Sequence, residues 1–116
     1  GGLSPDSETL RGFPGASGIV EGTVRVLASP DESEQLQQGE ILVASSTNIG
    51  WTLLFPKASA IITDVGAPLS HAAIVARELG IPAVVGCGNA TMRLKTGDRV
   101  LVNGGQGVVQ ILEKHA

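Results

Sequence analysis

Residues 63–86 read TDVGAPLSHAAIVARELGIPAVVG, and this segment sets the order of the surrounding elements. A loop with glycine and proline precedes a helical pattern over 70–79, which we expect to be the main helix. Gly80 is well placed to cap its C-terminal end, and Pro82 prevents the helix from continuing. Apolar residues recur at helical spacing, so one face is expected to pack on a sheet. That face comprises Ala72, Val75, Ala76 and Leu79.

Short apolar runs on both sides of this segment predict strands. They cover residues 19–27 (interrupted at Gly22), 41–44, 60–63, 83–85, 99–102 and 108–112. Helical turns are expected within 31–38, 48–57 and 89–95, and a glycine-rich turn over 12–18. Many short strands with few helices indicate an α/β fold in which sheets carry a helical layer on one side.

We expect one domain over residues 12–113, because the remaining segments show no periodicity. Residues 1–11 are predicted to be a linker or tail, and 114–116 a second tail. Within the domain, aliphatic side chains must fill the interior, since 42% of the 116 residues are hydrophobic but only 3% are aromatic.

Composition also restricts the function classes. The formal net charge of −3 argues against a general nucleic-acid binder. No apolar run approaches the roughly 20 residues that cross a bilayer, so no membrane partner is expected. The single cysteine, Cys87, cannot form an internal disulfide, which favours a reduced, cytoplasmic setting.

His71 is the principal candidate for chemistry. Ser70 is a favourable N-cap residue, which places His71 at the first helical position. The free N–H groups and the positive dipole of a first turn favour an anion there and disfavour a protonated ring. A ring nitrogen with a free lone pair can attack phosphorus. The small residues Gly66 and Ala67 nearby leave room for a bulky partner.

The position of His71 alone does not establish a role as a nucleophile, because a lone histidine at a helix start is more often an ordinary surface residue. Metal binding is not expected, because His115 is the only other histidine and Cys87 matches no zinc spacing. A serine-hydrolase site is not expected either, because Ser70 is not in a G-x-S-x-G motif.

The whole segment 63–86 resembles the signature of the mobile domain of phosphoenolpyruvate-utilising enzymes. This family includes phosphoenolpyruvate synthase, pyruvate phosphate dikinase, enzyme I of the sugar phosphotransferase system and rifampicin phosphotransferase. Segments 12–22, 41–44 with 51–55, and 103–112 resemble other parts of the same domain. The resemblance implies a swivelling β/β/α three-layer phosphohistidine domain, with His71 as the phosphorylated residue. Leu69 and Ala67 depart from the usual family pattern.

Three further residues are candidates for supporting roles. Gly66 is expected to let the loop turn beside the helix start, and Ser70 to cap the helix or, less simply, to contact the phosphoryl group. Thr63 either orients the His71 ring by a hydrogen bond or is a plain strand-end residue.

The resemblance implies a phosphotransferase of the synthase or dikinase type, of which this chain is the carrier domain and is not active alone. His71 would carry a phosphoryl group between a nucleotide-binding domain and a phosphoenolpyruvate, pyruvate or other acceptor domain. No cofactor is expected in this domain, whereas Mg²⁺ with ATP or phosphoenolpyruvate is expected in the partner domains. The alternatives are a stand-alone phosphocarrier or regulatory module, the histidine domain of a rifampicin-type phosphotransferase, and a swivelling domain that has lost the chemistry.

Overall fold

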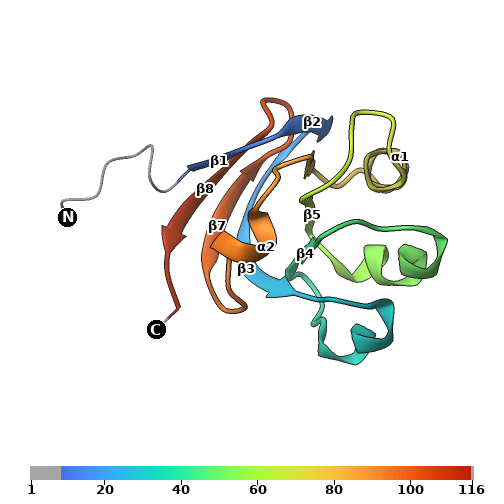
Figure 1. Cartoon of the computed structure of the whole chain (residues 1–116), viewed down its shortest axis with the longest axis horizontal. Coiled ribbons are helices and arrows are strands. Elements are labelled where there is room, and N and C mark those ends of the chain that lie inside the picture. Colours follow the sequence, from blue (N-terminus) through green and yellow to red (C-terminus); the bar gives the residue numbers. More distant parts are fainter. Residues whose placement is uncertain (1–8, 116) are drawn as a thin grey trace.

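The computed structural model describes residues 9–115, which fold into one mixed sheet with most of the helical residues on one side and the short helix over 90–93 packed in the other core (Figure 1). Within these residues, the strand order is β1-β8-β7-β3-β4-β5-β6-β2. The strands are β1 (Thr9–Arg11), β2 (Phe13–Ala16), β3 (Ile19–Val26), β4 (Ile41–Ala44), β5 (Ala60–Thr63), β6 (Ala83–Val85), β7 (Arg99–Asn103) and β8 (Val108–Glu113). The helices are η2 (Pro30–Gln35), η3 (Ile49–Lys57), α1 (His71–Leu79) and α2 (Ala90–Arg93).

Strand β3 joins two layers of the sheet. Its first part, Ile19 to Thr23, pairs with β7 in antiparallel fashion, and its last part, Val24 to Val26, pairs with β4 in parallel fashion. The ladder runs through Gly22, so the predicted interruption there is absent. A Cβ at Gly22 would lie 3.2 Å from the Ile41 side chain, which explains why the strand carries a glycine at this point.

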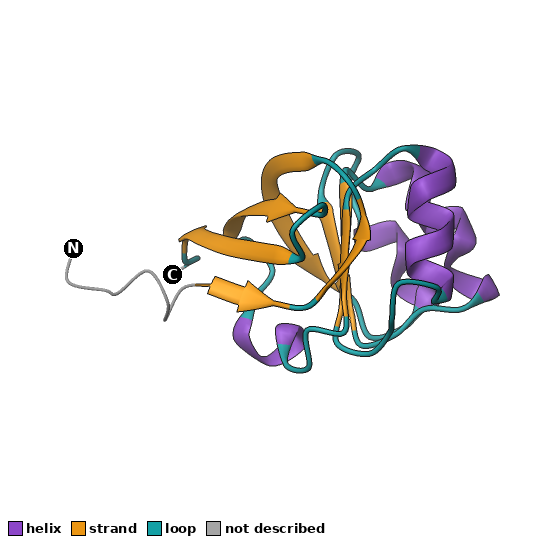
Figure 2. Cartoon of the chain, turned by 90° about the horizontal axis from the view of Figure 1, so that it is seen from above, coloured by secondary structure: helices purple, strands orange, loops and turns teal. Residues whose placement is uncertain are grey.

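Side chains of the parallel strands alternate between two separate cores, as the two-residue period of a strand requires. Ile41 and Val43 of β4 face the core between the two β layers, where they join Val24, Val100, Val102 and Val109. Leu42 and Ala44 of β4 face the helices instead. The molecule therefore has the β/β/α three-layer arrangement, with the helical layer on one side (Figure 2).

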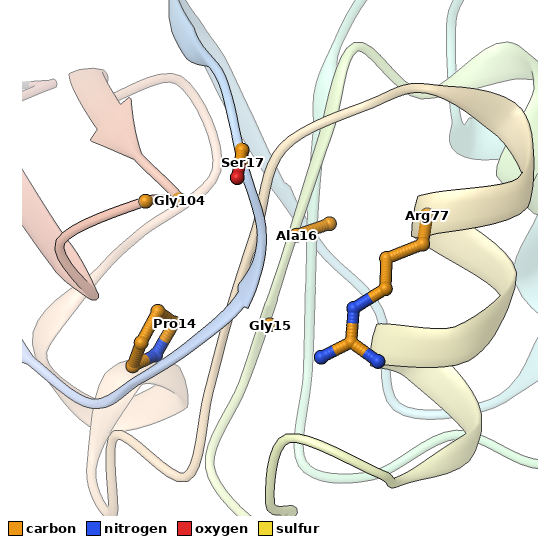
Figure 3. A pocket seen from close by; sticks show the side chains of 7 residues that line it. Pro14, Gly15, Ala16, Ser17, Arg77 and Gly104 are labelled. Atoms are coloured by element: carbon orange, nitrogen blue, oxygen red, sulfur yellow. The ribbon is translucent and has the colours of Figure 1, made fainter.

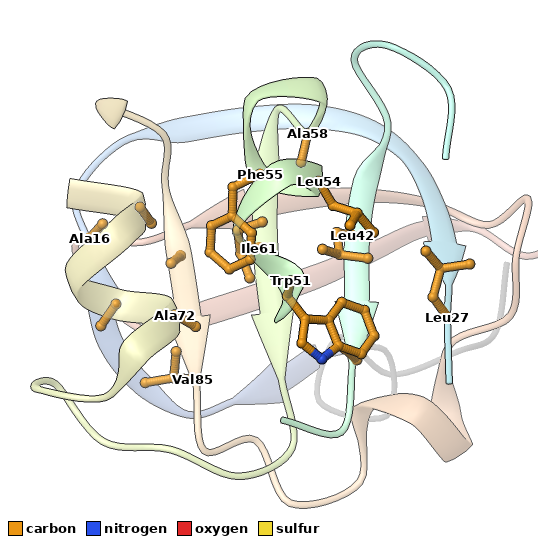
Figure 4. Close-up of a cluster of buried hydrophobic side chains, with 14 of the residues drawn as sticks. Ala16, Leu27, Leu42, Trp51, Leu54, Phe55, Ala58, Ile61, Ala72 and Val85 are labelled. Carbon is orange, nitrogen blue, oxygen red and sulfur yellow. The ribbon is translucent and has the colours of Figure 1, made fainter. Parts of the chain in front are cut away.

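The core beneath the helices contains the larger side chains. Trp51 and Phe55 of η3 pack there with Leu42 of β4, Ile61 of β5 and small residues of α1 (Figure 4). Trp51 is thus a core residue rather than an exposed docking anchor. None of the described helices is both long and apolar enough to cross a bilayer.

Helix α1 matches the prediction at both ends. It begins at His71, and Gly80 caps it in the left-handed conformation with a φ of 75°. Ala72 and Ala76 are buried as expected. The prediction for Leu79 was wrong: it is 45% exposed at the end of the helix, and Ala73 occupies the buried face.

Two predictions for the N-terminal region were also wrong. Residues 9–11 are not tail but form β1, which pairs with β8 and buries Leu10. The expected glycine turn over 12–18 contains β2, an edge strand that pairs with β6. Its glycine allows close approach, because a Cβ at Gly15 would lie 3.1 Å from the carbonyl oxygen of Ala83. Residues 1–8 of the predicted tail lie outside the described residues.

The predicted C-terminal tail is likewise attached as far as the structure describes it. The Lys114 ammonium and the His115 amide both donate hydrogen bonds to the buried carboxylate of Asp98, at 2.7 and 2.6 Å.

Candidate functional site

His71 lies at the first position of α1, at the edge of the helical layer. His71 is partly buried, and its imidazole packs edge-on against the buried ring of Phe55. The two ring centroids are 5.7 Å apart, and the angle between the ring planes is 71°. Phe55 belongs to η3, so two neighbouring helices determine the position of the imidazole. The ring is held by packing and still reaches the surface.

Two threonine hydroxyls contact the two ring nitrogens. Thr47 Oγ1 lies 2.9 Å from Nδ1, and Thr52 Oγ1 lies 3.3 Å from Nε2. Thr47 is in the loop after β4, whereas Thr52 is an exposed residue of η3. A hydroxyl both donates and accepts, so either tautomer of the imidazole satisfies these contacts.

Neither threonine was predicted to belong to the site. They precede His71 by 24 and 19 residues, and no local pattern links them to the helix start. The only sequence signal is that Thr52 lies in 51–55, which resembles the family segment before the signature; Thr47 lies in neither of the resembling segments 41–44 and 51–55.

The helix start carries unpaired hydrogen-bond donors. Ser70 occupies the N-cap position with extended backbone angles, but its side chain makes no capping bond and its Oγ is buried without a partner. The prediction that Ser70 caps α1 through its side chain was therefore wrong. Within the described residues, the Ile74 amide bonds to the Ser70 carbonyl at 3.0 Å, and the amides of 71–73 have no partner. Such N–H groups point out of the helix start and favour an anion.

Gly66 lies directly beside Ser70. Its φ of 145° is in the region that favours glycine, and a Cβ there would lie 3.1 Å from Ser70 Oγ and 3.3 Å from Val85 Cβ. The loop can therefore pass beside the helix start only with glycine at this position.

Thr63 is placed at the end of β5, as predicted, but it does not contact the imidazole. Its side chain is 1% exposed, and Oγ1 has no hydrogen-bond partner among the described residues. Thr47 and Thr52, rather than Thr63, make the hydrogen bonds to the His71 ring, because they belong to segments that lie beside it.

Cys87 lacks the properties of a reactive thiol. It packs against the core between the β layers. Burial, with a smaller effect from the Asp64 carboxylate, raises the pKa of the Cys87 thiol to about 12. The Asp64 side chain accepts hydrogen bonds from the amide and the hydroxyl of Thr91. Among the described residues, no three His, Cys, Asp or Glu side chains gather into a metal-binding group.

The fold and the helix-start histidine define a three-layer mixed α/β domain, and comparison with known proteins identifies its family. Residues 36–107 match the family model described as PEP-utilising enzyme, mobile domain. The chain therefore belongs to the family of mobile domains of phosphoenolpyruvate-utilising enzymes.

Named relatives include two kinds of enzyme. A probable phosphoenolpyruvate synthase from Staphylothermus marinus is 48% identical over 109 residues, which cover 92% of this chain and 13% of that protein. A rifampicin phosphotransferase from Bacillus cereus is 42% identical over 106 residues, covering 91% of this chain and 12% of that protein. The chain thus spans about an eighth of the length of these relatives.

A solved structure supports the fold. The solution structure of an Enzyme I protein superimposes with a TM-score of 0.60 at 38% identity, covering 68% of this chain and 33% of that one. In these relatives the matching segment is one part of a larger protein, so partner domains accompany it there.

Proposed function

We propose that His71 accepts a phosphoryl group from a donor held on another domain and transfers it to an acceptor on a third. The observation that carries this proposal is the geometry of the helix start: an accessible imidazole lies beside three amide groups without partners. These amides supply hydrogen bonds to phosphoryl oxygens, and the helix dipole favours their negative charge.

We assign the attack to Nε2. Nδ1 makes the shorter contact, with the partly buried Thr47, and in the reactive tautomer it donates its proton to Thr47 Oγ1. Nε2 then carries the lone pair, and the longer contact to the exposed Thr52 is readily given up. Thr47 and Thr52 are positioning residues in this scheme.

The chemistry consists of two in-line displacements. In the first, the Nε2 lone pair forms a bond to phosphorus while the bond from phosphorus to the donor oxygen breaks, and that oxygen keeps the electron pair. In the second, an oxygen of the acceptor attacks the same phosphorus, and the electron pair of the N–P bond returns to Nε2.

The exposed surface around the histidine suits docking to other domains. Leu53, next to Thr52, is 87% exposed, and Leu69, two residues before His71, is 80% exposed. Burying such exposed apolar side chains against a partner domain is favourable, because it removes apolar surface from water. Covering them also excludes water from the transfer step.

Among family members, we place this domain in an enzyme of the synthase or dikinase type. Support comes from the somewhat higher identity to the phosphoenolpyruvate synthase than to the rifampicin phosphotransferase. Mg²⁺ and the nucleotide or phosphoenolpyruvate would bind the partner domains, so this chain alone would not turn over substrate. The rifampicin-type acceptor is the competing assignment, because that relative matches the chain over nearly the same length.

The test is to incubate the domain with candidate partner domains, Mg²⁺ and either ATP or phosphoenolpyruvate. Intact-mass measurement should show a gain of one phosphoryl group that is stable in base and lost in acid. The gain should vanish in His71→Ala and persist in His115→Ala, the matched control at the other histidine. Transfer from the phosphorylated domain to pyruvate supports the synthase assignment, whereas transfer only to rifampicin replaces it with the antibiotic enzyme.

A further inference from the structure

The surface beside α1 is hollowed into a depression of about 190 Å³ that is separate from the His71 ring. Three segments line it: residues 14–17 in and after β2, Gly104 and Gly105 in the turn after β7, and Arg77 of α1. Arg77 follows His71 by six residues, which is about 9 Å along a helix axis.

The positive charge of Arg77 is not neutralised within the depression. No acidic residue lines it, and the ion pairs within the described residues involve Arg25, Arg99 and Lys114 but not Arg77. Figure 3 shows the Arg77 side chain extending from α1 toward the strand that carries Gly15. An exposed guanidinium with its five N–H donors therefore lies at one wall.

Further donors are present on the other walls. Ser17 contributes a hydroxyl, and the backbone amides of Ser17 and Gly105 make no hydrogen bond within the described part of the chain. Glycine on this wall leaves the backbone accessible, because no side chain covers it. Backbone N–H groups in glycine-containing turns are common ligands of anions.

We propose that this depression binds the phosphate group of a small molecule. The guanidinium pairs with two phosphate oxygens, and the donors of the glycine-containing walls reach the oxygens that point the other way. A carboxylate is planar and is satisfied by the guanidinium alone, so the donors on several sides favour a tetrahedral anion. This inference does not depend on the phosphorylation of His71.

The experiment is a titration of the isotope-labelled chain with inorganic phosphate at constant ionic strength, followed by amide NMR shifts. The amides of Ser17 and Gly105 should shift along saturable curves, with a dissociation constant on the order of millimolar. A parallel titration with acetate should shift them at least tenfold more weakly. Equal saturation by acetate, or shifts confined to the amides of 72 and 73, would overturn the proposal.

Substitutions distinguish phosphate binding at a specific site from nonspecific electrostatic attraction. Arg77→Gln should weaken phosphate binding at least tenfold. Arg77→Lys keeps the charge but loses the bidentate geometry of the guanidinium, and it should weaken binding severalfold. Lys95→Gln removes an equal charge at an exposed residue outside the depression and should leave binding unchanged. Equal weakening by Arg77→Gln and Lys95→Gln would contradict a specific site. Unchanged NMR shifts elsewhere show that each variant is folded.

Discussion

At the scale of single residues, the hydrogen bond between Thr47 and the His71 ring is the contact most directly linked to the proposed chemistry. Thr47→Val removes the hydroxyl and keeps the shape. Since a hydrogen bond of this kind contributes about 0.5–1.5 kcal/mol, we expect the rate of His71 phosphorylation to fall by up to about tenfold. Thr47→Ser should restore most of the rate. A valine variant that is phosphorylated at the wild-type rate would show that the contact has no positioning role.

Cys87 provides a second test at the residue scale, because its raised pKa keeps the thiol protonated in the folded chain. A shift from 9.0 to about 12 lowers the thiolate fraction at pH 8 by roughly a thousandfold. We expect labelling by a thiol reagent at pH 8 to be at least a hundredfold slower in the native chain than in urea. Equal labelling rates would contradict this burial.

The same pKa shift has a consequence for stability. The folded chain holds the Cys87 proton more tightly than the unfolded chain does. The contribution of Cys87 to the free energy of unfolding is therefore fully present below pH 9 and is lost as the pH rises from 9 towards 12. A Cys87→Ala variant should show a smaller decline in the free energy of unfolding over that range.

At the scale of elements, Asp98 attaches the C-terminal end of β8 to the loop before β7. Burial opposes ionisation of this carboxyl, but hydrogen bonds from the His115 amide, the Lys114 ammonium and the Lys95 amide outweigh it and hold the pKa of Asp98 below its ordinary value of 3.8. The stabilisation is therefore present above about pH 4 and is lost as the pH falls through the lowered pKa.

Asp98→Asn should reduce the free energy of unfolding at pH 7 by about 2 kcal/mol, as measured by urea denaturation. It should also remove part of the loss of stability at acid pH. Asp31→Asn is the control, because Asp31 is exposed and its side chain makes no hydrogen bond within the described residues. Similar effects of the two substitutions would mean that the Asp98 contacts contribute little.

The elements with strong local patterns could be predicted from the sequence. Helix α1 has clear signals at both ends, β4 and β6 are continuous apolar runs, and β5 is apolar up to its last residue, Thr63. Strand β1 could not be predicted, because three residues are too few to show a periodic pattern, and β2 could not, because glycine and proline in 12–18 are typical of turns. Their pairing depends on close approach to strands far away in the sequence.

The site was predictable only in part, for the same reason. His71 and Gly66 lie within the signature segment, whereas Thr47 and Thr52 reach the ring through tertiary packing. The capping role of Ser70 was predicted from residue preference, but tertiary context left its hydroxyl without a partner.

At the scale of the whole molecule, the turn after β7 lies against the edge strand β2, which is far away in the order of the sheet. A Cβ at Gly104 would lie 1.8 Å from the carbonyl oxygen of Ala16, so this turn packs directly against the end of β2. Gly104→Ala should lower the free energy of unfolding by more than about 2 kcal/mol, because the added methyl group would force the turn away from the end of β2.

Gly105→Ala is the matched control for that substitution. Its φ is not in the left-handed region, and the nearest atom to an added Cβ is 3.8 Å away. We expect its effect on thermal unfolding to be within about 0.5 kcal/mol. If both variants are equally stable, the close contact between the turn and β2 is not formed in solution.

The proposed site of phosphorylation is His71 itself, and its position can be measured directly. Trypsin cleavage after Lys57 and Arg77 releases residues 58–77, which contain His71 as their only histidine. After incubation with the partner domains and phosphoryl donor, and digestion at alkaline pH, mass spectrometry should place one acid-labile phosphoryl group on the His71 ring. Phosphate found on another peptide, or in acid-stable form on Ser59, Thr63 or Ser70, would rule out His71 as the phosphorylated residue.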